Sequence, residues 1–136
     1  MLERYEAGGN YSSASSVARW VVLRHDEPGG GFHFDWLLER PWGVGGGLVS
    51  FRVGVMPLSA AGDFSATRMV DHRNVYLEYE GEISGGRGRV SRVAWGSVGG
   101  MREDADRVEV SLGAGVGAYV CERVAGDEWR VRRVGE

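Results

Sequence analysis

A length of 136 residues fits one domain, and a hydrophobic content of 43% is enough to build a core, which excludes a disordered chain. The formal net charge of −3 argues against a protein that coats long stretches of nucleic acid, although a few arginines suffice to bind one strand end. The chain has one cysteine, Cys121, and no apolar run near the roughly 20 residues that a membrane helix needs. Since its beginning also lacks a signal-peptide pattern, we expect a cytoplasmic protein that contacts no membrane.

Residues 1–17 are polar and rich in Ser and Gly, which predicts a flexible lead-in to one folded domain over residues 18–136. Apolar runs with β propensity follow, separated by turns in which many of the 23 Gly residues lie. These runs predict strands, in chain order, at residues 20–25, 32–38, 48–55, 75–83, 87–95, 107–112, 118–124 and 129–134, with a loop at 58–67. Because apolar residues nowhere recur at helical spacing, we predict an all-β fold: a compact small β-barrel with short connecting loops and little helix.

Two of the three histidines, His25 and His33, lie close together in the sequence, and Asp35 follows His33 by two residues. Residues i and i+2 of a strand share a face, so His33 and Asp35 point the same way. A hairpin across the intervening Gly-rich turn would bring His25 beside them. Two imidazoles and a carboxylate suit a divalent transition metal such as Mn²⁺ or Zn²⁺. From this pattern alone, ordinary surface or core histidines are the alternative interpretation.

Two separated motifs add information to this cluster. In the first, an apolar strand leads to Arg24–His25, and a turn then leads to His33–Phe34–Asp35. In the second, Tyr76 follows Asp71–His72 by four residues, ahead of a Gly-rich turn. The same elements, in the same order, occur in the 3′-phosphoesterase domain of bacterial DNA ligase D. The spacing within the second motif is near-identical, whereas His25 and His33 are two residues further apart here than in the family. The chain resembles this family over residues 19–98, and it is similar to the small free-standing members of the family.

The resemblance implies an enzyme that removes a 3′-terminal ribonucleotide and then a 3′-phosphate from DNA during break repair, with Mn²⁺ as cofactor. The donor set leaves Zn²⁺ as the second choice. The implied partners are nucleic-acid 3′ ends or small phosphoesters, together with DNA repair proteins. By the same resemblance, His25, Asp35 and His72 hold the metal. His33 contacts the phosphate or donates a proton, and Tyr76 forms a hydrogen bond near the scissile group.

A second departure from the family pattern is a missing arginine. The family has an Arg two residues after the metal-binding Asp, whereas this chain has Leu37. An Arg neutralises charge that develops on a phosphoryl group and Leu does not, so this loss typically costs orders of magnitude in rate. Arg68 and Arg73, on either side of the second motif, are the candidates to bind phosphate in its place. The alternative function is a non-catalytic module that keeps the barrel and binds nucleic acid or a partner protein.

Overall fold

The computed structural model describes residues 17–135, so nearly all of the lead-in predicted at 1–17 lies outside the described residues. The strands are β1 (Arg19–Asp26), β2 (Phe32–Glu39), β3 (Leu48–Val53), β4 (Phe64–His72), β5 (Gly81–Glu82), β6 (Arg89–Glu103), β7 (Arg107–Leu112), β8 (Gly117–Ala125) and β9 (Glu128–Val134). Two short 3₁₀ helices, η2 (Pro57–Ser59) and η3 (Asn74–Leu77), flank β4. No helix in this described part of the chain has the length and apolar character that a membrane span requires.

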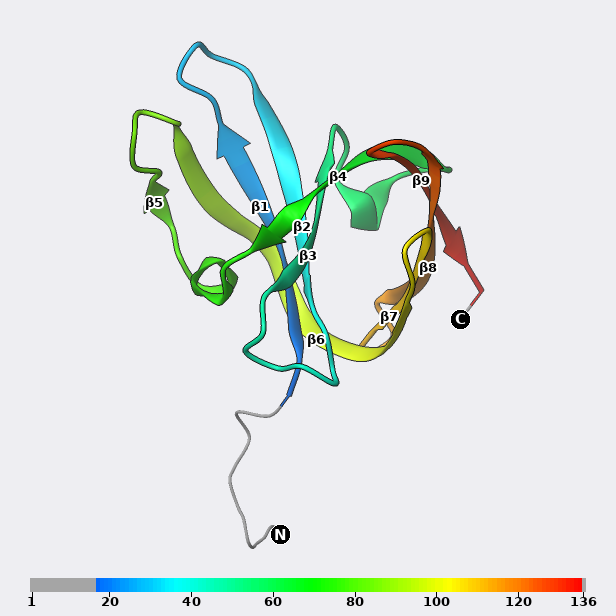
Figure 1. Cartoon of the computed structure of the whole chain (residues 1–136). Helices are drawn as coiled ribbons and strands as arrows, with labels where there is room; N and C mark the ends of the chain where they lie inside the picture. Colours follow the sequence, from blue (N-terminus) through cyan, green and yellow to red (C-terminus); the bar gives the residue numbers. More distant parts are fainter. Residues whose placement is uncertain (1–16, 136) are drawn as a thin grey trace, which may run out of the picture.

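Eight of the strands form a closed ring (Figure 1). They pair antiparallel in the order β1-β2-β3-β4-β9-β8-β7-β6, and β6 pairs back with β1. Closure gives each ring strand a partner on both sides along part of its length, which limits the exposed sheet edge, a common site of aggregation. The predicted all-β fold is therefore confirmed.

The interior of the ring holds the main hydrophobic core. Its buried side chains come from all eight ring strands, and the largest of them are Trp20, Trp36, Phe51, Tyr119 and Trp129. They alternate along each strand with residues that point outward, as the two-residue period of a strand requires. The aromatic rings meet edge to face, for example Trp36 on Tyr119, which favours one defined packing.

A second, smaller hydrophobic layer covers the outer face of β1, β2 and β3. Here the segment from η3 to β5 lies outside the ring (Figure 1), and its Leu77 packs on Val21, Leu23, Leu37 and Leu48. We call this cluster the outer layer. It explains why β1 and β2 are continuous apolar runs, because strands that are buried on both faces lose the alternation of polar and apolar residues.

Three segments differ from the sequence-based prediction. The strand predicted at 87–95 continues to Glu103 as β6, because its second half pairs with β7. Part of the loop predicted at 58–67 belongs to β4, because β3 and β9 both offer their backbone groups to this segment and tertiary pairing overrides the low β propensity of its small residues. The strand predicted at 75–83 is wrong for most of its length. Its first residues form η3, and only Gly81–Glu82 pair as β5. The tight turn of η3 directs Leu77 into the outer layer. An extended strand at 75–83 would not bring Leu77 to this cluster.

Candidate metal centre

The histidine and aspartate cluster lies on the outer face of β1 and β2, next to the outer layer. In the antiparallel register, His25 pairs with His33, and Leu23 pairs with Asp35. Directly paired residues share a face, so all four side chains point outward. The intervening Phe34 points inward and packs against the main core. The predicted hairpin thus brings His25 beside His33 and Asp35.

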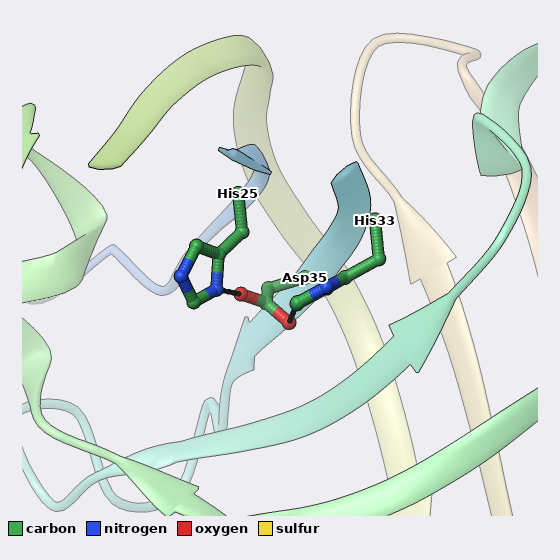
Figure 2. A group of neighbouring side chains, drawn as sticks. All are labelled: His25, His33 and Asp35. Atoms are coloured by element: carbon green, nitrogen blue, oxygen red, sulfur yellow. Dashed lines mark ion pairs between the residues drawn. The ribbon is translucent and has the colours of Figure 1, made fainter. Parts of the chain in front are cut away.

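The three side chains are close enough to share one ion. One nitrogen from each histidine and one carboxylate oxygen of Asp35 all lie within 4.8 Å of one another. His25 Nδ1 is 3.5 Å from Asp35 Oδ2, and His33 Nε2 is 3.2 Å from Asp35 Oδ1. Figure 2 shows the carboxylate between the two imidazoles. Both His33 and Asp35 are buried, so little of this group is exposed to water.

Neighbouring groups determine which imidazole nitrogens carry a proton. His25 Nε2 lies 2.7 Å from the backbone oxygen of Arg87, and His33 Nδ1 lies 2.7 Å from Glu27 Oε2. Both partners are acceptors, so these two nitrogens are the N–H donors. The hydrogen bond from His33 lowers the pKa of Glu27, which is therefore a carboxylate at neutral pH. In the neutral imidazoles, His25 Nδ1 and His33 Nε2 are left with lone pairs.

These two lone pairs face the carboxylate of Asp35. His33 Nε2 is buried and has no hydrogen-bond partner among the described residues, although a carboxylate oxygen lies beside it. Two lone pairs directed at an anion repel it unless a cation, either a proton on each ring or a shared metal ion, lies between them. A metal-binding histidine commonly donates its other N–H to a carboxylate or a backbone oxygen, as both histidines do here. The donor set and its outer partners therefore fit a divalent transition metal.

Gly88 explains how a distant turn reaches His25. It has φ of 97°, and a Cβ there would collide with the backbone oxygen of Asp26 at the end of β1. Only glycine combines this backbone conformation with so close an approach. The turn before β6 can therefore lie against β1, which places the Arg87 carbonyl on His25.

The second motif lies across a cavity of about 450 Å³ from the cluster. His72 and Tyr76 line this cavity together with His25 and Asp35. The imidazole of His72 packs edge-on against Tyr76, at 5.8 Å between ring centres, and its Nδ1 donates to the backbone oxygen of Val70. The predicted metal ligands His25, Asp35 and His72 thus share one cavity, but the group whose donor atoms lie within 4.8 Å contains His33 in place of His72.

The two arginines predicted to bind phosphate lie in different places. Arg73 lines the cavity beside Tyr76. Arg68 pairs across β3 and β4 with Phe51, which belongs to the main core, so its side chain points to the inner side of the sheet. There it forms an ion pair of 3.1 Å with Glu103 and lies over Trp129. The structure does not bring Arg68 to the cavity.

Three residues that reasoning from the sequence missed contribute to this region: Glu27, Arg52 and the carbonyl of Arg87. The alternation of Arg52 with Phe51 and Val53 was a usable signal, because it places Arg52 on the outer face of its strand. Nothing local marked Glu27 or Arg87, since their contacts to the histidines depend on how two turns fold back. A scan against models of protein families and a search of curated proteins each gave no match.

Proposed function

We propose that this protein is a metal-dependent phosphoesterase of the ligase D 3′-phosphoesterase type, acting on nucleic-acid 3′ ends or small phosphoesters in DNA repair. The observation that carries the proposal is that His25 Nδ1 and His33 Nε2, the ring nitrogens not bonded to Arg87 or Glu27, converge on the Asp35 carboxylate beside an open cavity. The order and spacing of the two motifs supports the family. A cytoplasmic location belongs to the same proposal and is favoured by the single, unpaired Cys121.

In this proposal His25, His33 and Asp35 hold a divalent ion, with Mn²⁺ as the first choice and Zn²⁺ as the second. When bound, such an ion polarises a phosphoryl oxygen and lowers the pKa of a coordinated water. Glu27 and the Arg87 carbonyl keep the two imidazoles in the ligating tautomer.

In this proposal, His72 and Tyr76 contact the substrate. The Nδ1–H of His72 is held by Val70, so its Nε2 is the nitrogen available to accept or give a proton. The edge-on packing of the two rings fixes the direction of the imidazole. Relative to the expectation from the resemblance, His33 and His72 exchange roles: His33 becomes a ligand, and His72 manages the proton.

The experiment combines metal binding with turnover. Purified protein is titrated with Mn²⁺ by calorimetry and is then incubated with primers that carry a 3′-phosphate or a 3′-terminal ribonucleotide. We expect wild type to bind Mn²⁺ and shorten or dephosphorylate the primer, and Asp35→Asn to do neither. Asp63→Asn is the matched control, because Asp63 is exposed in the loop before β4. Absence of Mn²⁺ and Zn²⁺ binding by wild type would show that the cluster is an ion pair of protonated histidines with Asp35.

A second function is favoured by the position of Leu37. This residue is fully buried in the outer layer, so β2 offers no cation beside Asp35. A non-catalytic module that binds nucleic acid or a partner protein would tolerate this. Tight binding of Mn²⁺ without turnover of any member of a broad phosphoester panel would identify that function.

A further inference from the structure

Arg52 is a basic residue directly beside the metal centre in the sheet. It lies in β3 and its Cα pairs directly with that of Asp35, so both side chains emerge from the same face. Its neighbours Phe51 and Val53 point inward and are buried in the main core. The backbone of Arg52 is thus held on both sides, while its side chain is exposed.

The guanidinium of Arg52 stands between two hollows. One is the cavity of about 450 Å³ that also contains His25, Asp35 and His72. The other, of about 400 Å³, contains His33. Arg52 therefore borders the cluster from the side of each histidine. An anion bound to a metal at Asp35 would lie within the reach of this side chain.

Within residues 17–135, Arg52 forms no ion pair and no side-chain hydrogen bond. Many other arginines of the chain are engaged: Arg24 with Asp26, Arg40 with Asp71 and Glu103, and Arg68 with Glu103. A solvated guanidinium on a surface strand needs no partner. An unpaired fork whose backbone is fixed beside a metal centre is, however, well suited to bind phosphate, because its planar donors match two phosphoryl oxygens.

We propose that Arg52 binds the phosphoryl group of the substrate at this site, supplying from β3 the positive charge that Leu37 cannot supply from β2. This inference rests on the proposed function, because it assumes an anionic ligand at the metal centre. The positive charge is supplied from β3 and not from β2 because the two side chains differ in burial. The side chain of Leu37 lies within the outer layer, whereas the side chain of Arg52 reaches solvent and the cavity.

The test uses inorganic sulfate, a tetrahedral dianion that does not precipitate Mn²⁺. Sulfate binding is measured by calorimetry at constant ionic strength, with and without Mn²⁺, for wild type, Arg52→Gln and Arg52→Lys. We expect Arg52→Gln to bind sulfate about 10- to 100-fold more weakly with unchanged Mn²⁺ affinity, since one charge-assisted contact is lost. Arg52→Lys should recover part of the affinity, because it keeps the charge and loses the fork. Arg130→Gln, an exposed arginine of β9, is the matched control.

The possible outcomes separate this inference from the proposed function. Equal sulfate affinity of wild type and Arg52→Gln would overturn the role of Arg52 and leave the metal centre intact. Sulfate binding that is absent from wild type, whatever its Mn²⁺ affinity, would overturn it as well. Sulfate binding that depends on Arg52 in a protein that binds no Mn²⁺ would support Arg52 while the metal-dependent function fails. Where primer turnover is present, Arg52→Gln should raise KM or lower kcat without changing the Mn²⁺ requirement.

Discussion

At the scale of single residues, Glu27 decides which nitrogen of His33 can bind a cation. It lies just after β1, and its carboxylate accepts the proton of His33 Nδ1 at 2.7 Å. Without this acceptor the imidazole could rotate, or place its proton on the buried Nε2 that faces Asp35. The contact is therefore worth more to metal binding than its exposed position suggests.

Glu27→Ala should lower the affinity for Mn²⁺ by about 10- to 100-fold, the usual cost of losing such an outer partner. The measurement is a calorimetric titration with Mn²⁺. Glu82→Ala is the control, because Glu82 is exposed and its ion pair with Arg89, at 3.6 Å, contributes little. Equal affinities of the two variants would show that Glu27 does not position the imidazole.

Arg68 and Arg73 were both predicted from the sequence to bind phosphate, and the structure places them on different faces of the sheet. Arg73→Gln should weaken sulfate binding about tenfold, because Arg73 lines the cavity. Arg68→Gln should leave sulfate binding unchanged and lower the free energy of unfolding by about 1–2 kcal/mol, because it removes an ion pair with Glu103. Calorimetry with sulfate and unfolding in urea give the two quantities. Loss of sulfate binding in Arg68→Gln would contradict the separation of the two faces.

At the scale of elements, β2 serves two layers at once. Trp36 and Leu38 fill the main core, and Leu37 fills the outer layer between them along the chain. Asp35, the outward residue just before Leu37, lines the cavity. The boundary between apolar packing and the proposed metal centre therefore falls between Asp35 and Leu37.

Leu37→Arg should destabilise the protein by about 3–5 kcal/mol, because it buries a charge without a partner, and it should not create activity. Leu37→Met, which keeps volume and polarity, should cost less than about 1.5 kcal/mol. Midpoints of urea unfolding compare the two variants. A Leu37→Arg protein as stable as wild type and more active on a 3′-phosphate primer would show that this position faces the substrate.

At the scale of the whole molecule, a network of charges joins three parts of the strand ring. Arg40, directly after β2, contacts Glu103 at the end of β6 at 2.6 Å and Asp71 in β4 at 2.7 Å, and Arg68 adds a second contact to Glu103. The hydrogen bond from Arg40 is the main cause that lowers the pKa of Glu103. The carboxylates of Glu103 and Asp71 raise the pKa of Arg40, so Arg40 and Glu103 are both ionised at neutral pH.

The network should make stability depend on pH in the acid range. Because the pKa of Glu103 is lower in the folded protein than its ordinary value of 4.5, its contribution is fully present above pH 4.5. The contribution is lost as the pH falls from there through the lowered pKa. Urea unfolding of wild type and Glu103→Gln at pH 7, 5, 4 and 3 checks this. The variant should be less stable at pH 7, and the difference should shrink at pH 3; a constant difference would contradict the linkage.

The local sequence pattern predicted two kinds of strand. In one kind, buried and exposed residues alternate, and in the other kind both faces are apolar. The prediction at 107–112 matches β7, because Val108, Val110 and Leu112 alternate with polar residues. It failed where tertiary partners decide. The small residues of β4 become a strand only because β3 and β9 lie on either side. The segment around Leu77 forms η3 because this turn buries the Leu77 side chain in the outer layer.

The sequence by itself determined the all-β class and the local cluster of His25, His33 and Asp35, because strand alternation and a short hairpin act over a few residues. Only the tertiary structure decided what surrounds that cluster. It brought His72 to the cavity, turned Arg68 to the inner side, and set Arg52 opposite Asp35. The reason is physical: which face of a strand is outside depends on how the ring closes, and closure involves strands that are far apart along the chain.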